Sequence, residues 1–90
     1  MTSETYVGID VSKDKLDVAM WGETNCLEVA NHKRGIAKLV KQMLERVPQL
    51  MIVEATGGYE EALVAALFEA GLPVAFLMLK VPLAYETQIY

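Results

Sequence analysis

Two short apolar runs that each end in a carboxylate place the strongest constraint on the fold of this chain. Residues 6–9 (YVGI) are followed by Asp10, and residues 50–53 (LMIV) are followed by Glu54. Continuous apolar runs of this length, bounded by polar residues, are typical of strands buried on both faces of a sheet. We therefore predict a strand at each run, with its acid at the carboxyl end.

The segment after the first run predicts a second and a third strand. Residues 15–21 alternate, with Leu16, Val18 and Met20 on one side and Asp17, Ala19 and Trp21 on the other. Residues 22–25 (GETN) are rich in turn formers, and apolar character resumes over residues 26–30 at the distance expected of a hairpin. The first three strands are expected to form an antiparallel meander.

Two helices are predicted in the rest of the chain. Asn31 is expected to cap the first, which ends before Pro48. Its apolar residues fall at helical spacing: Ile36, Leu39, Val40, Met43, Leu44 and Val47. The second helix is expected over residues 59–70 with Gly71 at its C-terminal cap, and a fifth strand over residues 72–79.

This order of elements predicts an α/β fold with a five-stranded mixed sheet. A meander extended by two right-handed crossovers gives the sheet order 3-2-1-4-5, with strand 2 antiparallel and helices after strands 3 and 4. Strands 1 and 4 are then parallel neighbours about 4.8 Å apart. Asp10 and Glu54 should therefore lie side by side at the carboxyl edge of the sheet, which is where open α/β sheets bind ligands.

A pair of converging carboxylates suits a hard divalent cation such as Mg²⁺. Phosphodiester cleavage commonly uses two such ions, and holding both takes further acids. Simpler interpretations exist for each residue. Asp10 could end its strand in an Asx-turn by accepting from the amide near Ser12, and Glu54 could be a solvated strand end.

Length and composition favour one domain, which we expect over residues 1–79, with residues 80–90 unassigned. The net charge of −4 argues against a free-standing binder of nucleic acid, because such binding rests on basic residues. Cys26 has no cysteine to pair with, and no signal peptide or membrane-length apolar run is seen. We expect a cytoplasmic protein without membrane contact.

Two segments also match a family. Residues 6–13 (YVGIDVSK) with 15–19 (KLDVA), and residues 53–60 (VEATGGYE), resemble the two N-terminal signatures of DEDD transposases of the insertion-sequence-110 group. The resemblance implies an RNase H-like, RuvC-like fold in which four acids bind Mg²⁺ or Mn²⁺, two ions in the complete site. It also implies a recombinase that works with DNA and a guide RNA, and we expect the chain to form a homo-oligomer. By this resemblance, Asp10 is the first acid and Glu54 the second.

The family's third and fourth acids lie in an Asp-x-x-Asp block beyond the fifth strand, and residues 80–90 contain no such block. The sequence is therefore expected to represent the N-terminal part of a DNA transposase. One alternative is a catalytically incomplete remnant or interaction module, in keeping with the 53% hydrophobic content. An actin-like ATPase fragment is a weaker alternative, because residues 10–14 (DVSKD) lack the expected glycine.

The remaining candidates are given structural roles. Asp17 is expected to face solvent or to support the site, and His32 to lie at the start of the first helix. Cys26 is expected to fill the core, and the aromatic rings of Trp21 and Tyr59 to act as packing anchors. The glycines of residues 56–58 (TGG) could expose amides to a phosphate, or merely allow a tight turn.

Overall fold

The computed structural model describes residues 5–23, 26–55 and 57–78 of the chain. These residues form five strands and two helices in the predicted order. The elements are β1 (Tyr6–Val11), β2 (Lys15–Met20), β3 (Cys26–Ala30), α1 (Lys33–Arg46), β4 (Leu50–Ala55), α2 (Glu61–Glu69) and β5 (Val74–Met78). The unassigned segment predicted at residues 80–90 lies outside the described residues.

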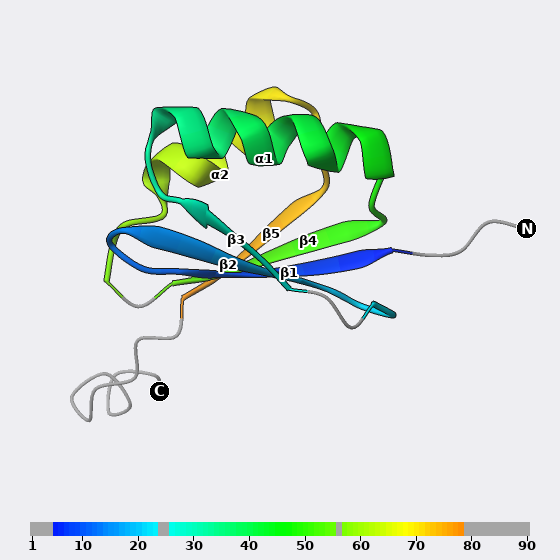
Figure 1. Ribbon diagram of the computed structural model, residues 1–90, viewed down its shortest axis with the longest axis horizontal. Helices are drawn as coiled ribbons and strands as arrows, with labels where there is room; N and C mark the ends of the chain where they lie inside the picture. The colour runs from blue at the N-terminus through cyan, green and yellow to red at the C-terminus, as the bar shows by residue number, and fades with distance from the viewer. Residues whose placement is uncertain (1–4, 24–25, 56, 79–90) are drawn as a thin grey trace, which may run out of the picture.

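The sheet has the order β3-β2-β1-β4-β5, as predicted. β2 is antiparallel to both β1 and β3, whereas β4 is parallel to both β1 and β5. Both crossovers move in the same direction across the sheet, from β3 to β4 and from β4 to β5. Since such connections are right-handed, both helices come to lie on the same face, and Figure 1 shows them together above the sheet.

One prediction about the strands is wrong. β1 is buried on one face only: Val7, Ile9 and Val11 are buried, whereas Tyr6, Gly8 and Asp10 are exposed. β4 likewise buries Met51 and Val53 but leaves Ile52 exposed. With both helices on one side, no described element covers the opposite side, which we call the open face.

The core fills the space between the sheet and the helices. Leu16 and Val18 of β2 are fully buried there, together with Leu39 and Met43 of α1 and Leu63 and Leu67 of α2. Leu44 and Val47, which share the helical spacing of the core residues, are exposed instead. No helix within the described part of the chain has the length and apolarity needed to cross a membrane.

The start of α1 differs from the prediction. His32, not Asn31, is the N-cap: its Nδ1 accepts a hydrogen bond of 3.2 Å from the amide of Gly35. Gly35 also lets the helix approach the end of β3, because a Cβ there would lie 2.0 Å from the carbonyl oxygen of Ala30. The helix therefore begins at Lys33, close behind the end of β3 at Ala30. The side chain of Asn31 is not needed as the N-cap.

Candidate functional site

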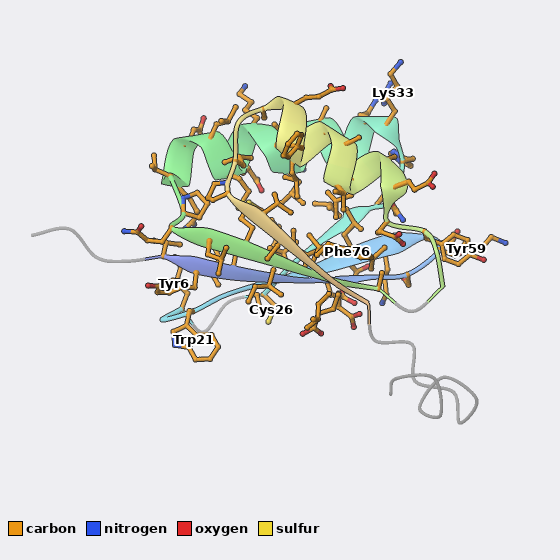
Figure 2. The ribbon with its side chains drawn as sticks, turned by 180° about the vertical axis from the view of Figure 1, so that it is seen from behind. Tyr6, Trp21, Cys26, Lys33, Tyr59 and Phe76 are labelled. Atoms are coloured by element: carbon orange, nitrogen blue, oxygen red, sulfur yellow. The ribbon has the colours of Figure 1, made fainter. Side chains whose placement is uncertain are left out.

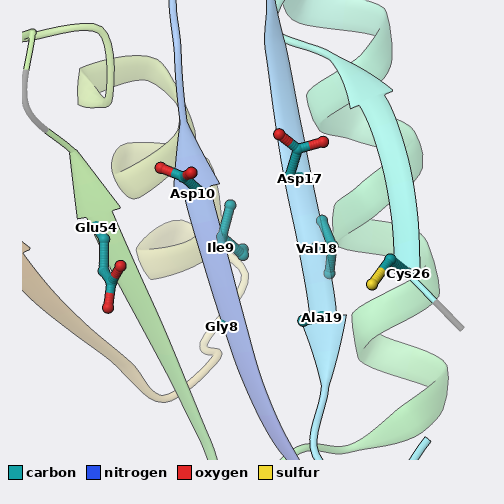
Figure 3. Close-up of a pocket in the computed structure, with 8 residues that line it drawn as sticks. All are labelled: Gly8, Ile9, Asp10, Asp17, Val18, Ala19, Cys26 and Glu54. Atoms are coloured by element: carbon teal, nitrogen blue, oxygen red, sulfur yellow. The ribbon is translucent and has the colours of Figure 1, made fainter. Parts of the chain in front are cut away.

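Asp10 and Glu54 lie directly opposite each other on the paired strands β1 and β4. Each is the second-last residue of its strand rather than the last, because the ladder continues to the pair Val11 and Ala55. Ile9 and Val53 are buried beneath the helices, so the two acids that follow them point to the open face. Figure 3 shows both carboxylates there, on neighbouring strands.

Two further acids continue the same row across the sheet. Asp17 on β2 is paired with Asp10, and Glu28 on β3 is paired with Asp17. The Lys15 Nζ lies 3.7 Å from Glu28 Oε1. Within the described part of the chain, no ion pair joins Asp10, Asp17 or Glu54 to a basic side chain. Three neighbouring carboxylates thus face solvent without a basic counter-ion, an arrangement that favours capture of a cation.

The sequence pattern alone did not place Glu28 in this row. Its phase follows from the alternation of residues 15–21 and from the register of the hairpin between β2 and β3. That register depends on the turn geometry of residues 22–25, which the turn composition alone does not specify. Asp17 stands on the exposed side that its alternation predicts.

A shallow hollow of about 270 Å³ lies beside the acids on the open face. Asp10, Asp17 and Glu54 line it together with small residues of three adjacent strands, Gly8, Ala19 and Cys26 (Figure 3). Cys26 is exposed here, so its predicted place in the core is wrong. The reason is its pairing with Ala19, which puts it in phase with the open face.

The aromatic residues at the ends of elements are not packing anchors. Trp21 is 80% exposed and Tyr59 is 48% exposed. Figure 2 shows Trp21, Tyr6 and Cys26 on the side of the sheet away from the helices. The rings of Trp21, Tyr59 and Tyr6 add apolar surface outside the core.

The connections that follow the two acids adopt defined turns. The amide of Ser12 donates to the carbonyl of Lys15 at 3.0 Å, so it is not available for the Asx-turn considered for Asp10. After Glu54, Gly58 has a φ of 84°, which favours glycine, so at least this glycine serves a turn. Thr56 lies outside the described residues.

The donor set fits a divalent cation in part. Carboxylate oxygens are the ligands that Mg²⁺ and Mn²⁺ prefer, and Mg²⁺ is often held by only one or two carboxylates with waters completing its shell. Among residues 5–23, 26–55 and 57–78, no group of three His, Cys, Asp or Glu side chains is arranged to hold a metal ion. The described residues thus offer two adjacent carboxylates, Asp10 and Glu54, as candidate ligands.

Comparison with known proteins identifies the family. The family model of the IS110-type DEDD transposases, described as transposase, matches residues 7–87, which is most of the chain. No curated protein matches.

Among solved structures, the chain is similar to RuvC of T. thermophilus, in a complex with a Holliday junction substrate. The TM-score is 0.65 at 16% sequence identity, over 86% of this chain and 66% of RuvC, and this likeness shows the RuvC-like fold. The chain therefore spans slightly less than two thirds of that relative. Because the family model matches residues 7–87, the chain belongs to the IS110-type DEDD transposase family.

Proposed function

We propose that this chain contributes to metal-dependent cutting and joining of DNA strands, with Asp10 and Glu54 as ligands of Mg²⁺ or Mn²⁺. The observation that carries the proposal is the register of β1 and β4, which pairs the two acids on the open face. Family membership supports the reaction class, and the RuvC relative, which was solved with a Holliday junction, supports DNA as the partner.

The hollow beside the acids lies on the open face, where no described element covers it. When bound, divalent ions activate the attacking oxygen and stabilise the leaving oxygen of a phosphodiester. The chain's own part is to fix the spacing of two ligands on rigid strands. Gly8 and Ala19 keep the adjacent surface low, so that a sugar-phosphate backbone can approach without meeting a large side chain.

Charge limits what the chain does alone. Its net charge of −4 and the row of acids repel phosphates. Binding of DNA therefore runs through the cation and through basic surfaces away from the row of acids, which a second copy in a homo-oligomer can supply.

The ligand assignment is tested by titrating Mn²⁺ into the wild-type chain and three charge-matched variants, with binding followed by calorimetry. Asp10→Asn and Glu54→Gln each keep the shape of the side chain but remove an anionic oxygen ligand, so Mn²⁺ affinity should fall by about tenfold or more. Asp14→Asn removes the same charge from an exposed acid outside the row and should leave the affinity near that of the wild type.

Circular dichroism should show the same fold in all four proteins. Equal Mn²⁺ affinity in the wild type, Asp10→Asn and Glu54→Gln would refute the assignment.

A second candidate is a catalytically incomplete interaction module. It is favoured by the absence of a three-ligand metal cluster among the described residues and by the exposure of Phe68 and Phe76 beside a hollow at α2 and β5. Self-association that is unaffected by Mn²⁺ and by Glu54→Gln, in a chain that binds no metal, would favour this candidate.

A further inference from the structure

The side chain of Asn31 joins two connections that are distant in sequence. Its Nδ2 donates to the carbonyl oxygen of Ser12 at 2.8 Å and to the carbonyl oxygen of Tyr59 at 3.1 Å. The carboxamide nitrogen has two hydrogens, so these bonds use both. We call this pair of hydrogen bonds the Asn31 bridge.

Each end of the bridge lies in the connection that leads away from one proposed ligand. Ser12 follows Asp10 by two residues, and Tyr59 follows Glu54 by five. The paired ladder of β1 and β4 ends one residue beyond the acids, at Val11 and Ala55. Past that point, the Asn31 bridge ties the two chain segments to a common side chain. Figure 1 shows the connections β1–β2, β3–α1 and β4–α2 at the same end of the molecule.

Asn31 is itself held in place by its backbone. Its amide donates to the carbonyl of Asp14 at 3.0 Å, and the residue is half-buried. The β1–β2 connection is further closed by the Ser12 Oγ, which donates to the carbonyl of Lys15 at 3.0 Å. The donor is thus presented from a fixed backbone, and fixed donors lose little conformational freedom when they bind.

The helix α1 does not need Asn31. Asparagine is a favoured N-cap, but His32 caps this helix. The carboxamide is therefore not used to satisfy the first turn of α1. Its two donors instead join the connections that follow the two proposed ligands.

From this geometry, we infer that Asn31 is a positioning residue of the proposed metal site, which holds the ends of the Asp10 and Glu54 strands in place by bridging the connections that follow them. The inference rests on the proposed function. Metal ligands depend on hydrogen bonds behind them for orientation, and loss of such a supporting group commonly weakens metal affinity by about 10- to 100-fold. The bridge contacts backbone carbonyls rather than the carboxylates. The loss of metal affinity on removing it should therefore lie near the lower end of this range.

The test compares Mn²⁺ affinity in the wild-type chain with that of Asn31→Ala, which removes both donors and keeps the backbone amide. Affinity should fall by about tenfold. Asn31→Leu keeps most of the side-chain volume without any donor and serves as the second variant if Asn31→Ala fails to fold. It should show the same loss.

Two controls separate positioning from lost stability. Ile36→Val shortens a core residue of α1 and lowers the unfolding midpoint without touching the bridge. Glu23→Gln weakens the exposed bond to Arg46 outside the row of acids. Both should bind Mn²⁺ as the wild type does. NMR relaxation of the Gly58 and Tyr59 amides should report greater motion in Asn31→Ala but not in the controls.

The outcomes distinguish the inference from the function on which it rests. Wild-type affinity in Asn31→Ala and Asn31→Leu, with binding still lost in Asp10→Asn, would overturn the positioning role and leave the metal site standing. If the wild-type chain binds no Mn²⁺, or if binding survives in Asp10→Asn and Glu54→Gln, the proposed function fails and the positioning role falls with it.

Discussion

Gly8 illustrates how single residues shape the open face. It lies in β1 between Ala19 and Ile52, and a Cβ built there would have no heavy atom within 4 Å. Its φ is not among the positive values found for other glycines of the described chain. The fold therefore does not require a glycine at this position. A side chain here would instead reduce the hollow beside Asp10.

Gly8→Ala should accordingly stabilise the chain. Alanine lowers the entropy of the unfolded state where the native backbone suits it, and the expected gain in free energy of unfolding is about 0.4–1 kcal/mol. Gly35→Ala, the contrasting control, should destabilise it, because the new Cβ would overlap Ala30 O. Urea unfolding of both variants measures the difference. A loss of stability in Gly8→Ala would contradict the conclusion that the space beside Gly8 is open.

Residues differ in how far the sequence predicts their roles. The pairing of Asp10 with Glu54 was predictable, because each follows an apolar run that marks a strand. The bridging role of Asn31 was not, because Asn31 and His32 are adjacent and either could cap α1. Only the tertiary placement of the Ser12 and Tyr59 carbonyls decides between them. Glu28 was missed because the hairpin register was not fixed.

At the scale of elements, periodic patterns were more informative than continuous apolar runs. The alternation of β2 predicts its buried and exposed sides correctly. The runs in β1 and β4 do not alternate between apolar and polar residues, so they suggested burial on both faces. In the structure, Tyr6 and Ile52 lie on the open face. An apolar run of four residues identifies a strand but leaves its environment undefined.

The C-terminus of α1 stores strain that a single substitution should relieve. Val47 has a φ of 51° and ψ of 62°, a left-handed conformation that is costly for a β-branched residue, and its side chain is exposed. Val47→Gly removes a steric cost of about 1–2 kcal/mol and adds an entropic cost of about 0.5–1 kcal/mol. The free energy of unfolding should rise by roughly 0.5–1 kcal/mol.

Ala37→Gly provides the control for this change, because it introduces glycine at an exposed site in the interior of the same helix. It should lower the free energy of unfolding by about 1 kcal/mol. Thermal or urea unfolding of the two variants gives opposite signs if the strain at Val47 is real. A loss of stability in both would contradict this account of the helix end.

For the whole molecule, the sheet order follows from connection rules, because two right-handed crossovers leave few alternatives. The same rule places both helices on one face, and so creates the open face on which the acids and the hollow lie. The central claim is that this face binds a divalent cation between β1 and β4. It depends on the assembled sheet, since Asp10 and Glu54 are 44 residues apart in the sequence.

The most direct test of this claim is a crystal structure of the chain grown with Mn²⁺, with data collected to record the anomalous signal of manganese. The account predicts an anomalous peak in contact with carboxylate oxygens of both Asp10 and Glu54, at about 2.0–2.3 Å by analogy with other oxygen-ligated divalent ions. Well-ordered Asp10 and Glu54 side chains without a peak between them, at a Mn²⁺ concentration that saturates binding in solution, would contradict it.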